Sequence, residues 1–114
     1  GTDSLASSPD LDVLAEARLA RRLFPGVPGE ALLRAATLGG AEALGFAAVT
    51  GSLEAGKSAD LLAVPLPDLA AADPYELLFA GEAPAAWRRR VMWRGAWRGE
   101  NLFPASLVSP PGRL

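Results

Sequence analysis

The sequence predicts an α/β chain, because segments with helical periodicity are followed by short segments that are typical of strands. Apolar residues recur at helical spacing up to about residue 37. A short, mostly apolar run then covers residues 60–66, and a strand–turn–strand pattern is centred on Gly95. Helices are therefore expected mainly in the first part of the chain and strands in the second.

The composition is that of a folded chain without a bias toward nucleic acid or membranes. The 114 residues are 50% hydrophobic, carry a net charge of -2, and include no cysteine and no histidine. The slightly negative charge predicts no nucleic-acid partner. No apolar run approaches the roughly 20 residues that span a bilayer, so no membrane partner is expected. No signal peptide is found, and a cytoplasmic location is therefore expected.

Two helices are predicted in the first part of the chain. The first is expected from Pro9 to about Phe24, with Ser8 as its N-cap and proline at its first position. Charged residues such as Glu16 and Arg18 are expected to face water. A second helix is expected from about residue 28 to 37. The apolar rows expected to be buried in the first helix are Val13, Ala17, Ala20 and Phe24, and Leu11, Ala15 and Leu19.

Three more elements follow from local signals. Thr37 is the expected N-cap of a short helix that ends at Gly45 in a left-handed C-cap. Residues 60–66 are expected to form a strand that is buried on both faces or nearly so. Asp73 precedes a proline and is expected to open another short helix.

The predicted hairpin carries half of the arginines and all of the tryptophans. Alternation places Arg88, Arg90, Met92 and Arg94 on one side and Trp87, Arg89, Val91 and Trp93 on the other. We interpret the arginines Arg88, Arg89, Arg90, Arg94 and Arg98 as a solvated face, with an anion-binding patch as the alternative. Trp87, Trp93 and Trp97 are interpreted as packing residues, because no basic excess accompanies them.

The segment Gly51–Ser58 matches the Gly-x-x-x-x-Gly-Lys-Ser pattern of a phosphate-binding loop. That loop requires a strand before it and a helix after it. Residues 46–50 are a poor strand candidate, and residues 59–64 are typical of a strand rather than a helix. Nucleotide binding is therefore the weaker interpretation of this segment.

Three segments together resemble a known superfamily. They are Thr37-Leu38-Gly39-Gly40-Ala41-Glu42-Ala43-Leu44-Gly45, the run from Gly51 through Lys57-Ser58-Ala59-Asp60 to Val64, and Gly1-Thr2-Asp3-Ser4-Leu5-Ala6-Ser7. The pattern resembles the C-terminal part of the amidohydrolase superfamily, in the branch of cytosine-deaminase-like, chlorohydrolase-like and nucleoside-deaminase-like enzymes. It covers roughly residues 1–98.

The resemblance implies a position within a larger fold. Residues 1–48 would be the end of the eighth strand of a (β/α)8 barrel with the helices that follow. Residues 49–114 would be the C-terminal strands of a small composite β-sandwich, with a short helix and an irregular tail. The sequence begins at Gly1 without an initiator methionine. We therefore expect the natural product to start upstream, and the expected partner is that N-terminal part.

The resemblance also implies a metal site. Asp3 would ligate a divalent metal, zinc or iron, and help to orient the hydrolytic water. Ser4 and Ser7 would be hydrogen-bond donors around it. The histidine ligands of the family would lie outside this chain. Without the resemblance, Asp3 is read as a loop carboxylate with local hydrogen bonds, and the serines as solvated. Asp60 is interpreted as structural.

The function implied is hydrolysis of a C–N bond, by deamination of a small heterocyclic or nucleoside-like substrate with metal-activated water. This chain without histidine would not be competent alone. The alternative is a non-catalytic module derived from such an enzyme, which packs or dimerises through the hairpin and its tryptophans. A homodimer is left open under both interpretations.

Overall fold

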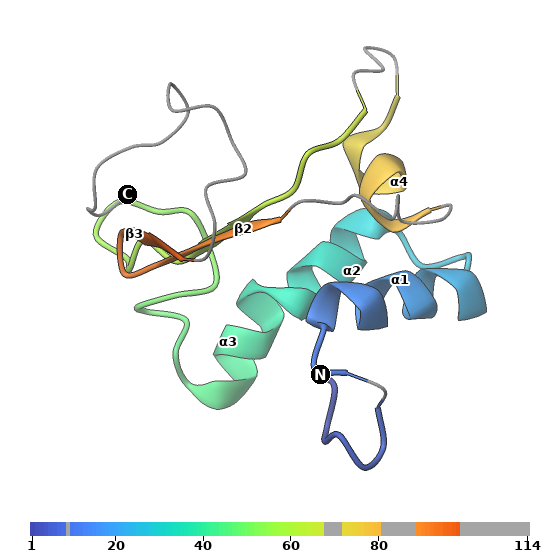
Figure 1. Ribbon diagram of the computed structural model, residues 1–114, viewed down its shortest axis with the longest axis horizontal. Coiled ribbons are helices and arrows are strands. Elements are labelled where there is room, and N and C mark those ends of the chain that lie inside the picture. Colours follow the sequence, from blue (N-terminus) through green and yellow to red (C-terminus); the bar gives the residue numbers. More distant parts are fainter. Residues whose placement is uncertain (9, 68–71, 81–88, 99–114) are drawn as a thin grey trace. The chain divides into compact units, whose positions relative to one another are not determined.

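The computed structural model describes residues 1–8, 10–67, 72–80 and 89–98. The expectations for Trp87, Arg88 and the C-terminal tail lie outside these residues. The described elements comprise helices and strands, as predicted for the α/β class (Figure 1). In chain order they are α1 (Val13–Leu23), α2 (Gly29–Ala36), α3 (Leu38–Leu44), β1 (Leu61–Ala63), α4 (Pro74–Phe79), β2 (Arg90–Trp93) and β3 (Ala96–Arg98).

The chain forms two compact units that are each discontinuous in sequence. One combines residues 1–40 with 66–82, and the other combines residues 41–65 with 83–114. The helix α4 thus joins the unit that contains α1 and α2. The boundary predicted at residue 48 concerns the domains of a complete enzyme, and it stays a prediction.

The helical unit packs α1, α2 and α4 around a small core. Ala17 of α1, Leu32 of α2 and Phe79 of α4 are its buried apolar side chains, and Phe79 is only 1% exposed. Burial of one such aromatic side chain contributes roughly 1.5–3 kcal/mol. The partly buried side chains packed against this core are Leu14, Ala20, Val27, Leu33, Tyr75 and Leu78.

The first helix begins later than predicted. Asp12, and not Ser8, is its N-cap, and Asp12 Oδ1 accepts hydrogen bonds from the amides of Leu14 at 3.0 Å and Ala15 at 3.2 Å. A capping carboxylate also interacts favourably with the positive end of the helix dipole. The prediction for Ser8 was wrong because a charged cap lies four residues further on, at the start of the regular helix.

The burial of α1 also differs from the prediction. Arg18 is 6% exposed, and its Nη1 donates a hydrogen bond to the carbonyl of Leu78 at 2.5 Å. Burial lowers the pKa of this guanidinium, and Arg22 lowers it further. In contrast, Val13 is 42% exposed and Phe24 is 62% exposed. The face predicted to be buried is therefore covered only around Ala17.

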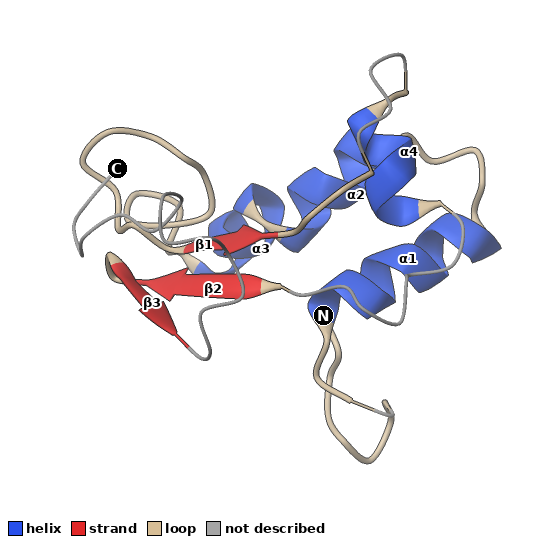
Figure 2. Ribbon diagram, turned by 45° about the horizontal axis from the view of Figure 1, so that its top comes forward, coloured by secondary structure: helices blue, strands red, loops and turns tan. Residues whose placement is uncertain are grey.

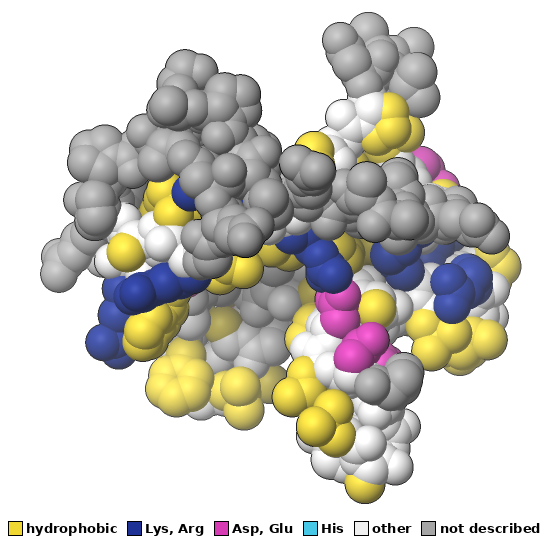
Figure 3. All heavy atoms as spheres, in the orientation of Figure 1, with side chains coloured by type: hydrophobic (Ala, Val, Ile, Leu, Met, Phe, Trp, Pro, Cys, Tyr) yellow, Lys and Arg dark blue, Asp and Glu magenta, His cyan; other side chains and the backbone are white. Residues whose placement is uncertain are grey.

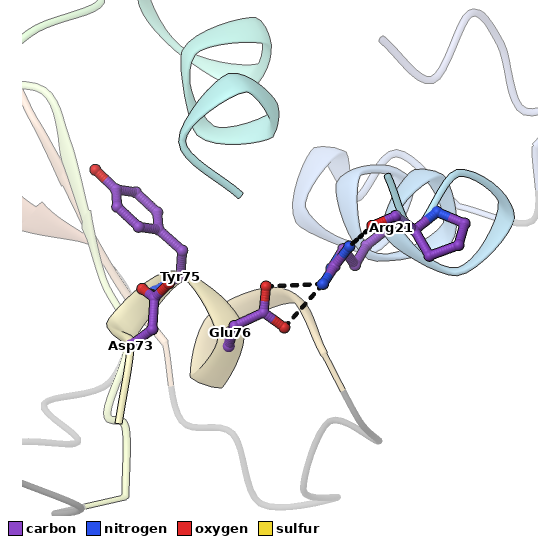
Figure 4. A network of polar contacts seen from close by, with 5 residues as sticks. Arg21, Asp73, Tyr75 and Glu76 are labelled. Atoms are coloured by element: carbon purple, nitrogen blue, oxygen red, sulfur yellow. Dashed lines mark hydrogen bonds and ion pairs between the residues drawn. The ribbon is translucent and has the colours of Figure 1, made fainter. Parts of the chain in front are cut away.

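Residue Asp73 caps α4 as predicted, since its Oδ1 accepts a hydrogen bond from the amide of Tyr75 at 2.9 Å. An ion pair joins α4 to α1, with Arg21 Nη2 2.8 Å from Glu76 Oε1 and 3.0 Å from Oε2 (Figure 4). The same guanidinium donates to the carbonyl of Pro25. Helix α4 is thus held at its start by a local cap and on its side by a charged contact.

The predicted break at Thr37 is confirmed, but its capping role is not. Thr37 Oγ1 donates to the carbonyl of Leu33 at 2.7 Å, so the hydroxyl closes α2 instead of opening α3. Gly45 ends α3 with a φ of 79°, as predicted. The amide of Phe46 bonds to the carbonyl of Ala41 at 2.8 Å, and the Gly45 amide bonds to that of Glu42 at 3.1 Å. This pair of bonds is the Schellman motif.

The other unit contains an antiparallel sheet with the strand order β1-β2-β3 (Figure 2). Arg94 and Gly95 form the predicted hairpin turn, with φ values of 50° and 78°. Positive φ at both positions gives the tight turn whose twist matches the flanking strands. Strand β1 is shorter than predicted and is not buried on both faces, because Leu62 is 46% exposed.

The predicted division of β2 side chains between two faces is confirmed, but the solvated assignment is wrong for Arg90. Arg90 is 3% exposed and Met92 is 8% exposed, whereas Val91 and Trp93 are about half exposed. The guanidinium of Arg90 lies 4.1 Å from the centre of the Trp97 ring. An arginine can therefore be buried here because its stem is apolar and its planar head stacks on an aromatic ring.

Large hydrophobic side chains remain at the surface of both units (Figure 3). In the helical unit they include Leu11, Val13, Leu19, Leu23 and Phe24, and in the other unit Leu44, Phe46, Val49 and Leu53. Among the described helices, none has the length and apolarity to cross a membrane.

Candidate functional site

The three residues predicted for the site lie together in one turn near the start of the chain. Asp3 has a φ of 63°, a left-handed conformation that aspartate tolerates better than most residues. Ser7 Oγ donates a hydrogen bond to Asp3 Oδ2 at 3.2 Å. Ser4 Oγ and Ser7 Oγ are 3.4 Å apart. The turn therefore presents one carboxylate and two hydroxyls from a short stretch of chain.

Backbone hydrogen bonds give this turn its shape. The amides of Ser7 and Ser8 both bond to the carbonyl of Ser4, at 3.1 Å and 2.9 Å. Asp3, Ser4 and Ser7 are exposed, and the side chains between them are small or apolar. Asp3 Oδ1 has no hydrogen bond within the described part of the chain. The carboxylate is thus oriented by Ser7 and open on its other oxygen.

A contact that the sequence analysis missed joins the turn to α1. Ser8 Oγ donates to Glu16 Oε1 at 3.1 Å, and Ser8 is 8% exposed. Sequence reasoning assigned Ser8 to the helix cap and Glu16 to the wet side of the helix. The spacing of eight residues across a turn follows no local pattern, so no sequence signal pointed to this pair.

The turn fits one ligand position of a metal site. Carboxylate oxygens are ligands for zinc and for iron, and Asp3 offers one such oxygen. A catalytic zinc site needs about three protein ligands. Among the described residues, no group of three or more His, Cys, Asp or Glu side chains is placed to hold a metal. Asp3 therefore fits as a single ligand that other residues must complete.

The carboxylate of Asp60 is used within the sheet-containing unit. Its Oδ1 accepts a hydrogen bond from the amide of Arg94 at 2.7 Å, and its Oδ2 accepts one from Thr50 Oγ1 at 3.3 Å. The hydrogen bond from Arg94 holds the pKa of Asp60 below its ordinary value, against the opposing effect of burial. These contacts tie the loop before β1 to the hairpin turn, which agrees with the structural interpretation of Asp60.

The segment Gly51–Ser58 does not have the structure of a phosphate-binding loop. Lys57 Nζ donates to Ser52 Oγ at 2.6 Å and lies 2.7 Å from Glu54 Oε2. The hydrogen bond from Lys57 also lowers the pKa of Glu54. A strand, β1, follows this segment where a helix is required. Its lysine is therefore neutralised locally, and the nucleotide interpretation is not supported.

The described arginines of the hairpin differ in their surroundings. Arg94 and Arg98 lie over the Trp93 ring, at 5.0 Å and 5.2 Å from its centre. Arg90 is buried against Trp97. The prediction of one solvated arginine face was therefore wrong for Arg90. The described tryptophans serve as ring surfaces for these cations, and contacts of this type contribute about 0.5–1 kcal/mol at exposed sites.

The turn presents one exposed carboxylate, that of Asp3, and the helix α1 follows it in the chain. The family model described as the amidohydrolase family matches residues 1–98 of this chain. The chain belongs to the amidohydrolase family. Members of this family are generally metal-dependent hydrolases, and the resemblance read from the three sequence segments is thereby confirmed.

The chain is similar to enzymes named 5-methylthioadenosine/S-adenosylhomocysteine deaminase. It is 46% identical to that of Moorella thermoacetica in a 71-residue alignment that covers 56% of this chain and 17% of the relative. For that of Bacillus cereus the identity is 44% over 70 residues, 55% of this chain and 16% of the relative. For that of Teredinibacter turnerae it is 40% over 76 residues, 60% and 17%. The matched part thus spans about one sixth of these relatives.

Proposed function

We propose that this chain is the C-terminal part of a metal-dependent deaminase that acts on an adenosine-like nucleoside. Membership of the amidohydrolase family supports the reaction class. The names of the similar deaminases support the substrate class. The single structural observation that carries the proposal is the exposed carboxylate of Asp3, oriented by Ser7 and open at Oδ1.

In this proposal the turn lies at the end of the eighth barrel strand, and α1 is the helix that follows it. The strands β1, β2 and β3 belong to the composite β-sandwich. An N-terminal part of the same protein supplies the histidine ligands and the remaining strands. Such a partner would cover exposed apolar side chains of both units.

The overall reaction exchanges an exocyclic amine for an oxygen. Water adds to the ring carbon, the C–N bond breaks, and ammonia leaves with the proton that the water gave up. When bound, a divalent metal supplies a water that loses its proton near neutral pH. Asp3 Oδ1 would hold the metal, and the Ser7 hydroxyl would keep Oδ2 turned toward the protein. Ser4, close to Ser7, would restrict how that hydroxyl rotates.

The test compares Asp3→Asn with Asp10→Asn, a second exposed aspartate of the same segment. Both are made in the chain assembled with its histidine-bearing part, and metal content and ammonia release from 5-methylthioadenosine are measured. Substitution of a residue that only hydrogen-bonds a metal ligand lowers metal affinity or activity by about 10–100-fold. Asp3 would be a ligand itself, so Asp3→Asn is expected to lose bound metal and at least about 100-fold in activity. Asp10→Asn should retain both. Full metal content and activity in Asp3→Asn would refute the proposal.

A second candidate, a non-catalytic module that dimerises, is favoured by one observation. Val91 and Trp93 are 47% and 50% exposed on the same face of β2. Two copies joined through this face would cover both side chains. Sedimentation of the chain over a range of concentrations tests this, with Trp93→Ala as the variant expected to remain monomeric. A monomer at every concentration excludes it.

A further inference from the structure

We propose that Glu16 is a positioning residue for Asp3, acting through Ser8. Ser8 Oγ donates to Glu16 Oε1 at 3.1 Å, and this hydrogen bond joins the turn that carries Asp3 to the first turn of α1. The inference rests on the proposed function, since it supposes that Asp3 binds the metal. It adds a residue that neither touches the metal nor is close to Asp3 in the sequence.

Among the described residues, the other hydrogen bonds of this turn are internal to it. Residues 3–7 are exposed in the described chain, so few of its own side chains pack against them. The bonds from the amides of Ser7 and Ser8 to the carbonyl of Ser4 set the shape of the turn but not its place on the protein. Ser8 is the point at which the turn becomes buried, at 8% exposure. Its hydroxyl contact with Glu16 therefore ties the turn to α1.

Glu16 is suited to this role because the helix around it is fixed. The next two residues, Ala17 and Arg18, are both buried. Arg18 Nη1 donates to the carbonyl of Leu78 in α4, and the ion pair of Arg21 with Glu76 holds the following turn of α1. The carboxylate of Glu16 thus belongs to a helix that is held in place by α4, and its contact with Ser8 attaches the turn to that helix.

A continuous path of hydrogen bonds links Glu16 to the carboxylate of Asp3. Ser8 contacts Glu16 through its hydroxyl and the carbonyl of Ser4 through its amide, at 2.9 Å. The same carbonyl accepts a bond from the Ser7 amide at 3.1 Å, and the Ser7 hydroxyl donates to Asp3 Oδ2 at 3.2 Å. A displacement of Ser8 would therefore reach Asp3 through the Ser4 carbonyl and Ser7.

The test uses Glu16→Ala, Glu16→Gln and Ser8→Ala, with Glu30→Ala as the matched control. Glu30 is also a glutamate in the first turn of a helix, α2, and it is exposed. Amide hydrogen exchange is measured in the chain, and zinc affinity is measured by competition with a chelator in the assembly with the histidine-bearing part. Glu16→Ala and Ser8→Ala should speed exchange at the amides of Ser7 and Ser8 and weaken zinc binding about 10-fold.

The conservative variant separates positioning from charge. Glu16→Gln keeps an oxygen that accepts the bond from Ser8, so most of the zinc affinity should remain, and Glu30→Ala should leave it unchanged. Equal losses in Glu16→Gln and Glu16→Ala, or no difference between Glu16→Ala and Glu30→Ala, would overturn the inference. If Glu16→Ala does not fold, Ser8→Ala decides by the same criteria.

The two proposals fail in different ways. Normal zinc binding in Asp3→Asn would refute the proposed function and the positioning role with it. Loss of zinc in Asp3→Asn, combined with normal affinity and exchange in Glu16→Ala and Ser8→Ala, would overturn the positioning role alone.

Discussion

The carboxylate of Asp60 gives a sharp test of what stabilises the sheet-containing unit. Its Oδ1 accepts the amide of Arg94 at 2.7 Å, which is at the short end of the range for a charge-assisted hydrogen bond. The contact from Thr50 to Oδ2, at 3.3 Å, is long for a hydroxyl donor. We therefore assign most of the stabilisation to the contact with Arg94.

A hydrogen bond to a charged group contributes about 1.5–3 kcal/mol. Because Arg94 is exposed, water can replace the lost acceptor, and the lower part of this range applies. Asp60→Ala is expected to lower the free energy of unfolding by about 2 kcal/mol. Asp60→Asn keeps a neutral acceptor and should lower it by about 1 kcal/mol.

The assay is urea-induced unfolding of the chain, followed by tryptophan fluorescence. Trp93 and Trp97 lie in β2 and β3, so the signal reports on the sheet that Asp60 contacts. Glu54→Ala is the control, because it removes an exposed carboxylate from the same loop and should change stability less. Equal unfolding midpoints for Asp60→Ala and Glu54→Ala would refute the assigned role of Asp60.

The same contact predicts how stability depends on acid. The pKa of Asp60 in the folded chain lies below its ordinary value of 3.8, because the amide of Arg94 donates to the charged form. Between these two pKa values the unfolded chain binds a proton that the folded chain does not, so stability rises with pH. The contribution is complete above the ordinary pKa and is lost as pH falls through the folded pKa. Parallel acid profiles for the wild type and Asp60→Asn would contradict this.

Two further predictions concern the helical unit. Gly29→Ala should destabilise it by about 1–3 kcal/mol through overpacking, because a Cβ there would lie 2.5 Å from Tyr75 Cβ. The control Gly26→Ala places its Cβ in open space and should change stability by less than about 1 kcal/mol. Equal unfolding midpoints for these two variants would show that the approach of α2 to α4 is not close. A double-mutant cycle of Arg21→Ala and Glu76→Gln should give a coupling of about 0.5–1 kcal/mol, since both side chains are partly exposed, and a coupling of zero would exclude a stabilising ion pair.

The features that were predicted correctly depend on neighbours in the sequence. The cap at Asp73, the C-cap at Gly45 and the turn at Gly95 each follow from one residue type in one local conformation. The family resemblance was likewise carried by short segments, and the match over residues 1–98 confirms it. Local chemistry of this kind requires no knowledge of the rest of the fold.

The features that were missed depend on partners in other elements of the fold. Arg18 is buried because the carbonyl of Leu78, far along the chain, lies within reach of its guanidinium. Arg90 is buried because Trp97 offers a ring surface. Arginine has a long apolar stem, so its charge alone does not decide which face of an element it occupies. Sequence periodicity could not supply either partner.

The candidate site was predicted only in part. Asp3, Ser4 and Ser7 lie in one turn, as their closeness in the sequence required. Their attachment to Glu16 could not be foreseen, because it depends on where the chain enters α1. The later start of α1, at Val13, frees Ser8 from a capping role and leaves its hydroxyl available to Glu16.

The two compact units are interleaved along the chain, and this order restricts how they can be made. As the chain is synthesised from its N-terminus, α1 and α2 emerge early, but Phe79 of α4 arrives only after the loop and strand β1 of the other unit. Until then Ala17 and Leu32 lack the side chain that closes their core. The sheet is likewise incomplete until β2 and β3 have been synthesised. A single break in the chain therefore cannot separate the two units, and each unit stays incomplete while residues of the other are being synthesised.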